Sequence, residues 1–298
     1  MDGATACDTA SDGAASSEMT LDGLRYCILD PTGNITALVE DPVAEGEQPA
    51  VAVAIMERHP AVEQVGFVRE FTENSPVQSA LRMAGGEFCG NATMSAAALH
   101  LLRAEEAQGG ASEETACVRV LVSGAAEPVE VQLLATGEAA FDARVRMPRA
   151  RAIEQVELAF GQLAGSLPVV HMEGISHAVI DEDSPFFELL ADQQAAEQAV
   201  CAWCKELGAD GLGLMFVQGS GNTRTLTPLV YVPGGDTVFW ENSCASGSSA
   251  VGMYAAAQEG APVQLALCEP GGTLRVLSDP TVGETWLAGK VQLVEERP

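Results

Sequence analysis

The sequence predicts an α+β fold of two similar lobes, in which each lobe wraps strands around one buried helix. Three observations predict it: many short β-type runs, a small number of Ala-rich helical runs, and a cysteine motif that occurs twice. The chain has 298 residues, of which 47% are hydrophobic and 19% are charged, so there is enough apolar material for a sizeable core. At about 150 residues per domain, this length suggests two domains.

Short runs rich in Val, Ile and Leu predict strands in both halves of the chain. Turn signals such as Pro31-Thr-Gly-Asn34 and Thr136-Gly-Glu138 separate these runs. The predicted strands are 25–29, 35–39, 64–68, 118–122, 129–134 and 143–147 in the first half, and 168–171, 177–180, 213–217, 229–232, 274–277 and 290–294 in the second.

Ala-rich runs predict four helices, at residues 42–56, 89–104, 185–207 and 246–259. The runs that follow Cys89 and Cys244 carry no charged residue for about three turns. A helix that is apolar on all sides is buried. We therefore expect these two helices at the centres of the two lobes.

The segments around Cys89 and Cys244 also resemble each other. Each has an acid shortly before the cysteine, Glu87 and Glu241 respectively, and each continues with small and hydroxyl-bearing residues. They lie about half the chain length apart. A repeat on this scale predicts two lobes of similar structure.

The charge balance excludes several classes of protein. The chain has 15 Lys and Arg residues against 42 Asp and Glu residues, and its net charge of -27 repels nucleic acid and anionic membrane surfaces. No apolar stretch reaches the 18 or so residues of a membrane-spanning helix. Residues 1–18 lack the features of a secretory signal, and the eight cysteines are irregularly spaced, so we expect a cytoplasmic protein with reduced thiols.

Both Cys89 and Cys244 are predicted at the N-terminus of a buried helix, where free N–H groups and the positive end of the helix dipole favour a thiolate. The same N–H groups can hold a carboxylate. These groups belong to Gly90, Asn91, Ala245 and Ser246. A carboxylate clamped between the two helices would have a sulfur on either face of its α-carbon. This geometry suits a two-base racemase in which one thiolate takes the α-proton and the opposite thiol returns one, with no metal and no organic cofactor.

The motifs around the two cysteines resemble those of the diaminopimelate epimerase superfamily. Glu87-Phe-Cys-Gly-Asn-Ala-Thr is similar to its first cysteine motif, and Ser243-Cys-Ala-Ser-Gly to its second. Further elements follow in the family's order: Pro31-Thr-Gly-Asn34, Glu63-Gln64, Ser176-His-Ala-Val179 and Glu269-Pro-Gly-Gly272. The resemblance covers residues 24–298. Longer matches, among them Gly86–Ser95 and Trp240–Cys244, resemble the branch of histidine racemases that serves staphylopine-type metallophore synthesis.

This resemblance implies a diaminopimelate epimerase-like fold: two pseudo-symmetric lobes, each a mixed β-barrel-like sheet around a central helix, with the site in the cleft between them. It also implies that the last strand returns to the first lobe. We therefore expect residues 19–126 with 286–298 to form the N-terminal lobe and 127–285 the C-terminal lobe, after a disordered tail at 1–18. By the same resemblance, Asn34 and Gln64 are expected to bind substrate, with Glu87 and His177 as further candidates.

Departures from the diaminopimelate pattern favour another amino acid as substrate. Ile175-Ser-His177 lacks the Asn, and Val232–Asp236 lacks the Glu-Arg pair, that hold the distal amino acid end in that family, and a second charged head would be poorly satisfied without them. The resemblance to the histidine racemase branch implies histidine, and Glu241 beside the second cysteine is the candidate acceptor for an imidazole N–H. Diaminopimelate or another amino acid stays open as the alternative substrate.

Two further readings of the function are weaker. A non-catalytic ligand-binding homologue would not need a thiol on each face of its ligand. A pyridoxal-phosphate racemase needs a Schiff-base lysine and a phosphate cup, and neither Lys205 nor Lys290 follows a Gly-rich loop. The expected partner is an amino acid, bound as a small-molecule substrate, with no nucleic acid and no membrane, and the sequence leaves a homodimer open.

Overall fold

The computed structural model describes residues 21–71, 75–108, 115–233 and 237–297. Within these ranges, sixteen strands form one continuous mixed sheet, against which four α-helices and one 3-10 helix pack. The predicted α+β class is confirmed. The tail predicted at 1–18 lies outside the described residues.

The elements up to residue 147 build most of the first lobe. They are β1 (Tyr26–Asp30), β2 (Thr36–Val39), α1 (Gln48–Arg58), β3 (Gln64–Glu70), β4 (Ser79–Met83), α2 (Gly90–Gln108), β5 (Ala116–Val122), β6 (Val129–Gly137) and β7 (Ala140–Met147).

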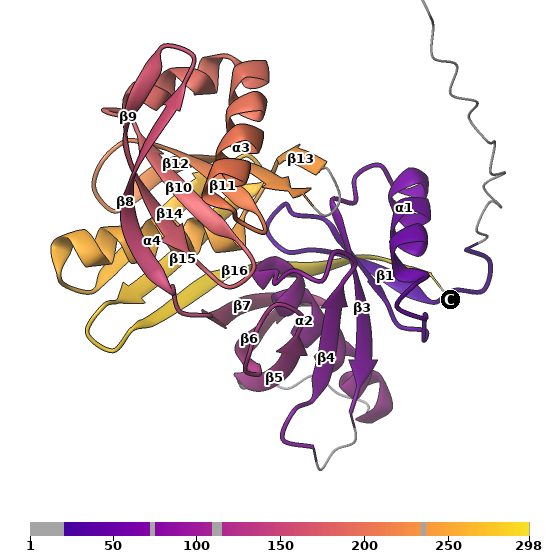
Figure 1. Cartoon of the computed structure of the whole chain (residues 1–298). Coiled ribbons are helices and arrows are strands. Elements are labelled where there is room, and N and C mark those ends of the chain that lie inside the picture. The colour runs from indigo at the N-terminus through magenta and orange to yellow at the C-terminus, as the bar shows by residue number, and fades with distance from the viewer. Residues whose placement is uncertain (1–20, 72–74, 109–114, 234–236, 298) are drawn as a thin grey trace, which may run out of the picture.

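The elements from residue 152 onward build the second lobe and the connection back to the first (Figure 1). They are β8 (Ala152–Phe160), β9 (Leu163–His171), β10 (Ser176–Asp181), the 3-10 helix η1 (Pro185–Ala191), α3 (Gln193–Leu207), β11 (Leu212–Gln218), β12 (Thr223–Val232), β13 (Thr237–Trp240), α4 (Ala245–Glu259), β14 (Val263–Glu269), β15 (Gly272–Asp279) and β16 (Glu284–Arg297). The order of strands in the sheet is β1-β2-β3-β4-β5-β6-β7-β16-β15-β14-β12-β11-β10-β9-β8, with β13 paired to β12.

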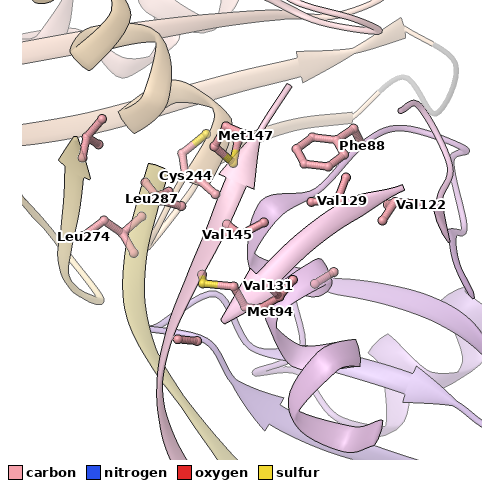
Figure 2. Close-up of a cluster of buried hydrophobic side chains, with 14 of the residues drawn as sticks. Phe88, Met94, Val122, Val129, Val131, Val145, Met147, Cys244, Leu274 and Leu287 are labelled. Carbon is pink, nitrogen blue, oxygen red and sulfur yellow. The ribbon is translucent and has the colours of Figure 1, made fainter. Parts of the chain in front are cut away.

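The two helices that begin with about three charge-free turns are buried over those turns, as the sequence predicts. In α2, Met94 and the alanines that follow it are almost fully covered, and strands β4 to β7 pack around the helix. Residues alternate along β6 and β7 so that Val131 and Val145 face this core (Figure 2). Cys244, at the start of α4, lies beside Met147 of β7 in the same cluster. One continuous core therefore runs from one central helix to the other.

Two predicted helices differ in extent from the observed ones. The helix predicted at 42–56 spans Gln48–Arg58, because Pro49 occupies the first turn, where a missing N–H is tolerated. The helix predicted at 185–207 is two elements. Asp192 separates them, since its carboxylate accepts a hydrogen bond of 3.1 Å from the Ala195 N–H and so begins α3.

Four observed strands were not predicted. β8 buries only Leu158 completely, so its sequence shows little apolar alternation. β13 is four residues long, and the short strand β4 includes Arg82 at a half-buried position. β14 does alternate, but its partly buried positions include Ala266 and Cys268, which do not favour a strand strongly.

Strand β16 joins the lobes. Its first half pairs antiparallel with β15 and β7, and its second half pairs with β1, where Tyr26 lies opposite Arg297. In Figure 1 it runs from the second lobe across to the first. The pairing of β16 with β1 is the contact expected of a last strand that returns to the first lobe, and the assignment of 286–298 to that lobe stays a prediction.

The boundary between the lobes at 126/127 stays a prediction. Strands β6 and β7 contact α2, the central helix of the first lobe, and this packing favours a boundary after Met147 instead. Among the described residues, no helix combines the length and the apolar character needed to cross a membrane.

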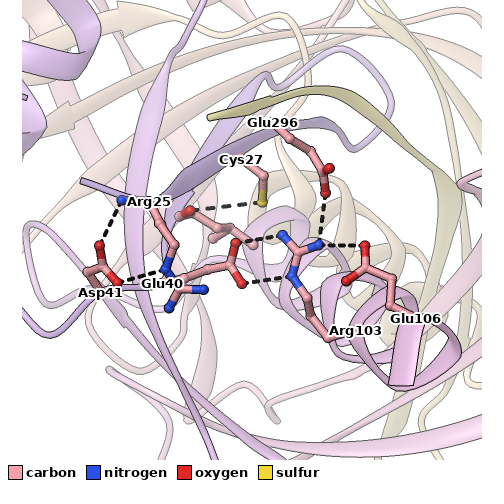
Figure 3. A network of polar contacts seen from close by, with 8 residues as sticks. Arg25, Cys27, Glu40, Asp41, Arg103, Glu106 and Glu296 are labelled. Atoms are coloured by element: carbon pink, nitrogen blue, oxygen red, sulfur yellow. Dashed lines mark hydrogen bonds and ion pairs between the residues drawn. The ribbon is translucent and has the colours of Figure 1, made fainter. Parts of the chain in front are cut away.

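A cluster of charges fixes the end of β16 to the first lobe (Figure 3). The Arg103 guanidinium on α2 donates two hydrogen bonds to the Glu40 carboxylate, at 2.6 and 2.8 Å. It also donates to Glu296 at 2.9 Å and to Glu106 at 3.0 Å. The Arg103 side chain is 27% exposed and that of Glu40 is 15% exposed, so this bidentate pair is only partly screened by water.

Replacing this guanidinium should weaken the fold. We expect Arg103→Met to lower the free energy of unfolding by about 1 to 3 kcal/mol, because the carboxylates lose their partner while they stay partly buried. The measurement is urea denaturation at low salt. Arg58→Met removes the same charge from an exposed helix end and should change stability by less than about 0.5 kcal/mol. Equal effects of the two changes would show that the cluster contributes nothing specific.

Candidate active site

A cavity of about 510 Å³ opens between the two lobes. Its lining contains both repeated cysteines and all of the predicted site residues except His177. These are Asn34, Gln64, Glu87, Cys89, Gly90, Asn91, Glu241, Cys244, Ala245 and Ser246. Residues that lie more than 200 positions apart in the sequence therefore meet in one cleft.

Cys89 directly precedes α2 and caps it. Its sulfur accepts a hydrogen bond of 3.4 Å from the Ala92 N–H, and its carbonyl accepts from the N–H of Thr93 at 3.0 Å. Cysteine here does what Ser or Asp does at other helix starts, using Sγ in place of an oxygen. The side chain is partly exposed to the cleft.

Cys244 caps α4 in the same way. Its sulfur accepts from the Gly247 N–H at 3.4 Å, and its carbonyl accepts from the Ser248 N–H at 2.9 Å. The residue is 4% exposed. Because a helix leaves its first N–H groups without intrahelical partners, Gly90 and Asn91 on one side and Ala245 and Ser246 on the other present such donors at the cleft.

The two helix starts touch each other across the boundary between the lobes. A Cβ atom added at Gly90 would lie 2.9 Å from the Ala245 Cβ, so only glycine allows this approach. The Asn91 amide, which is 1% exposed, donates to the Ser243 carbonyl at 3.1 Å. The Asn91 side chain therefore links the lobes, while its backbone N–H belongs to the helix end.

A polar network fixes Asn34 and Gln64 in the first lobe. The Gln64 amide donates to the Asn34 side-chain oxygen and, at 2.7 Å, to the Thr36 hydroxyl. The Asn34 amide donates to the Glu63 carboxylate at 2.9 Å, and the Asn242 amide donates to the other oxygen of the same carboxylate. Glu63 therefore spans the lobes and also lines the cavity.

Glu63 was not among the predicted site residues. The sequence did contain a signal, because Glu63 stands beside Gln64 in one of the elements that resemble the superfamily. A single acid before a strand is most often a solvated surface residue. Only its contacts with Asn34 and Asn242 in the folded structure show that Glu63 belongs to the site.

Burial dominates the ionisation of the cleft. It raises the pKa of Glu241 to about 7 and also raises the pKa of Glu87. Burial raises the pKa of Cys89 to about 12, against the Ala92 N–H and the Gln64 amide, which lower it. The pKa of Cys244 is raised well above its ordinary value by burial and then by Glu241. The lowering that we expected from the helix dipole is therefore outweighed by the burial of both sulfurs.

His177 does not join the other predicted residues. It lies on β10 with no exposed surface, close to Gly213 of the neighbouring strand, and neither ring nitrogen has a hydrogen-bond partner in the described part of the chain. Burial lowers its pKa to about 3, so the imidazole is neutral. This placement favours a core histidine over a substrate contact.

No metal centre is found in the part of the chain that the structure describes, since no three His, Cys, Asp or Glu side chains gather there to hold an ion. Cys201 and Cys204, which form a Cys-x-x-Cys pair in the sequence, lie one turn apart on α3 in the second lobe. The groups suited to hold a ligand are the helix N–H groups and the carboxyl groups of the cleft.

Most of the chain matches a known protein family. The family model described as the histidine racemase CntK N-terminal domain matches residues 23–296. The chain belongs to this family. Membership in a racemase family makes the protein an isomerase, in agreement with the prediction from the two cysteine motifs.

Relatives support the assignment along most of the chain. A histidine racemase of Fusobacterium nucleatum subsp. nucleatum (strain ATCC 23726 / VPI 4351) is 28% identical over 279 residues, which cover 92% of this chain and 95% of the relative. A histidine racemase of Staphylococcus aureus (strain Mu50 / ATCC 700699) is 28% identical over 266 residues, covering 86% and 88%.

Solved structures show the same fold at low sequence identity. A probable proline racemase from Agrobacterium radiobacter K84 superimposes with a TM-score of 0.68 at 11% identity and covers 92% of each chain. A hydroxyproline epimerase from Agrobacterium vitis gives 0.61 at 11% identity, covering 92% of this chain and 91% of its own. These neighbours confirm the epimerase-like fold that the motifs implied.

Next to the cleft, the backbones of the two lobes meet at two glycines. Gly33 precedes Asn34 and has a φ of +94°, and a Cβ atom there would collide with the Gly271 Cα. The Gly271 N–H in turn donates to the Asn242 carbonyl at 2.8 Å. This contact therefore sets the spacing of the two loops that contain Asn34 and Asn242.

A side chain at this contact should force the lobes apart. We expect Gly33→Ala to lower the free energy of unfolding by about 2 to 5 kcal/mol, since it adds a collision with backbone atoms to the strain of a positive φ. Gly23 is a matched control, because its φ is +81° and nothing lies within 4 Å of an added Cβ. Gly23→Ala should cost only the strain, about 1 to 2 kcal/mol, in the same urea titration. If the two variants lose equal stability, the glycine contact does not hold the lobes together.

Proposed function

We propose that the protein is a cofactor-independent amino acid racemase that acts by two-base proton transfer, with histidine as its substrate. One observation supports this most strongly. Cys89 and Cys244 each cap a buried helix, and both line the same cleft from opposite lobes, in a chain that belongs to a histidine racemase family.

The helix ends supply the electrostatic part of the reaction. The substrate carboxylate lies at the N–H groups that begin α2 and α4, where both helix dipoles favour negative charge. When the α-proton leaves, its bonding electrons move onto this carboxylate. Preorganised N–H donors stabilise the charge that develops there, and this is the main source of the rate enhancement.

The cysteines carry out the proton transfers. One sulfur, as thiolate, takes the α-proton and becomes a thiol, while the thiol on the other face gives its proton to the α-carbon and becomes a thiolate. The configuration inverts, and atoms and charge balance without any added reagent. The two cysteines have exchanged roles at the end of each turnover.

The acids of the cleft fit a doubly basic substrate. Glu63, Glu87 and Glu241 line the same cavity, and histidine offers an α-ammonium and an imidazole N–H. A bound ammonium also favours a thiolate nearby, which counteracts the effect of burial on the cysteine pKa. Diaminopimelate is disfavoured because the residues that would hold its second head are replaced. A reducing, cytoplasmic location suits an enzyme that needs two free thiols.

The class and the substrate can be tested together by proton exchange. The twenty amino acids are incubated singly with the protein in D2O without added cofactor, and α-deuteration is followed by mass spectrometry. We expect exchange with histidine. Exchange with another amino acid alone would retain the class and change the substrate, and no exchange with any of them would overturn the proposal.

Removing either sulfur should stop the reaction in both directions. We expect Cys89→Ala and Cys244→Ala each to lower the rate of histidine racemisation by roughly 100-fold to 10,000-fold, because each enantiomer presents its α-hydrogen to a different sulfur. Polarimetry from pure L- and pure D-histidine measures this. Cys117→Ala, at an exposed position on β5, is the control and should racemise normally. Near wild-type activity of either active-site variant would rule out the two-base assignment.

The role of Glu241 can be tested by removing its charge alone. A carboxylate there would stabilise the imidazole N–H by about 1.5 to 3 kcal/mol. Glu241→Gln keeps the shape, so we expect histidine turnover to fall by roughly one to two orders of magnitude. The comparison is proton exchange with leucine, a neutral amino acid of similar size. An equal loss on both substrates, or none on either, would show that Glu241 only supports the helix end.

A further inference from the structure

A second buried carboxyl group lies behind the cleft and takes no part in the reaction described above. Glu269 is the last residue of β14, is 8% exposed, and does not line the cavity between the lobes. Burial and the charge of Glu241 raise its pKa, and hydrogen bonds from Ser248 and from the Cys244 N–H lower it. A carboxyl group so deeply buried is costly unless its oxygens are satisfied.

Both oxygens of Glu269 are satisfied by the first turn of α4. One accepts a hydrogen bond from the Cys244 N–H at 2.6 Å, and the other accepts from the Ser248 hydroxyl. The first contact fixes the backbone of Cys244 itself, and the second fixes the helix one turn later. Glu269 therefore determines where the Cys244 sulfur lies without touching the cavity.

The first lobe has no carboxyl group at the corresponding place. Strand β5 follows α2 as β14 follows α4, and the residue after β5 is Ser123. Its hydroxyl accepts from the Met83 N–H at 3.0 Å and donates to the Glu87 carbonyl at 2.9 Å. The loop that leads to Cys89 is thus held by a neutral group, and the loop that leads to Cys244 by an acid.

The surroundings of the two sulfurs also favour a thiolate at Cys89 more than at Cys244. The Cys89 sulfur accepts a hydrogen bond from the Ala92 N–H, and the nearby Gln64 amide also lowers its pKa, so both groups favour a thiolate. Cys244 receives one from the Gly247 N–H and, like Cys89, has two acids near it. The difference is that Glu241 raises the Cys244 pKa through a hydrogen bond as well as through its charge, and that Glu269 binds the Cys244 N–H.

The charged groups near the pair are few, and they act unequally. Glu241 and Glu87 face Cys89, Glu241 and Glu269 face Cys244, and Glu241 faces Glu269. Burial raises the pKa of Glu269 to about 8, below the raised pKa values of both thiols, so Glu269 is already charged in the pH range in which they ionise. A carboxylate there opposes a second negative charge on Cys244.

We propose that Glu269 is a positioning residue that holds Cys244 as the thiol of the pair, so that Cys89 is the first of the two to ionise. This inference rests on the proposed two-base function and adds to it a resting order of the two cysteines. The pseudo-symmetric lobes are therefore chemically unequal before substrate binds.

The test measures the ionisation of each cysteine separately. The reduced full-length protein is treated with iodoacetamide between pH 7 and 12, a range that extends to the raised pKa of Cys89, and peptide mass spectrometry gives the alkylation rate of each cysteine. The pH midpoint of the rate reports ionisation and does not depend on how accessible the sulfur is. We expect the Cys89 midpoint to lie below that of Cys244. The opposite order would overturn the inference.

The role of Glu269 is tested by Glu269→Gln, which keeps the shape and removes the charge. At pH 8.5 we expect the alkylation rate of Cys244 to rise about tenfold, the effect of one pKa unit, with no change at Cys89 or at the exposed Cys117. Glu259→Gln makes the same charge change at the exposed far end of α4 and should leave all three rates unchanged. A purely structural role would alter both active-site cysteines or neither, and either result would overturn the inference.

A second variant covers the case in which Glu269→Gln does not fold. Ser248→Ala removes the hydroxyl that lowers the pKa of Glu269, so Glu269 stays neutral to higher pH. Cys244 should then react faster at pH 8.5, by a smaller factor, while Cys89 is unchanged. No selective change at Cys244 would count against the proposal. Histidine racemisation is measured on the same samples, so loss of the proposed function and failure of the cysteine order are seen separately.

Discussion

Two helix N-termini that face each other across one cleft are the constraint on which the rest of the structure depends. Both ends carry the positive side of a helix dipole and N–H groups without intrahelical partners, so they repel each other unless negative charge lies between or behind them. The surrounding residues provide negative or electron-rich groups at both helix ends. Sulfur caps each helix, carboxyl groups line the cleft, and Glu269 binds the first turn of α4 from behind. A substrate carboxylate between the two helix ends would accept hydrogen bonds from their free N–H groups, so the backbone itself supplies the attraction for it.

The sheet converts this local requirement into a fold. The first three turns or so of each helix must be free of charge to lie inside its lobe. Strands must cover these turns on nearly every side, which a single layer of strands achieves only by curling around them. Because β16 pairs with strands of both lobes, the two curled sheets are one, and the helix ends meet at a fixed separation. The Arg103 cluster and the contact between Gly33 and Gly271 fix the two sides of this junction.

Much of the site could be predicted from the sequence, because its chemistry is local. A cysteine before a charge-free helix places a sulfur beside free N–H groups whatever the rest of the fold does, and the repeat of that pattern predicted the pair Cys89 and Cys244. What could not be predicted depends on contacts between distant residues. Glu63 links the lobes through Asn242, and Glu269 binds the backbone of Cys244, so both depend on residues that are far away in the sequence. The raised pKa of the thiols results from burial, which a short motif does not predict.

The sequence also suggested contacts and elements that the structure places differently. His177 lies in a motif that resembles the superfamily, but its side chain is buried in the core and does not line the cleft. Asp192 caps the start of α3, and this contact divides a run whose Ala-rich composition predicted one continuous helix.

The position of β16 also bears on how the protein is made. The ribosome synthesises this strand after both central helices and after the strand β1 with which it pairs, and the residues in that pairing are among the most distant in the chain. Each lobe can begin to collapse around its own helix during translation, because most of its strands are already available. The junction between the lobes cannot form as early, because the long-range pairing of β1 with β16 requires β16 to have been synthesised. The nascent chain therefore holds two unjoined halves until β16 is available, and only the pairing of this strand with β1 brings the two helix starts together.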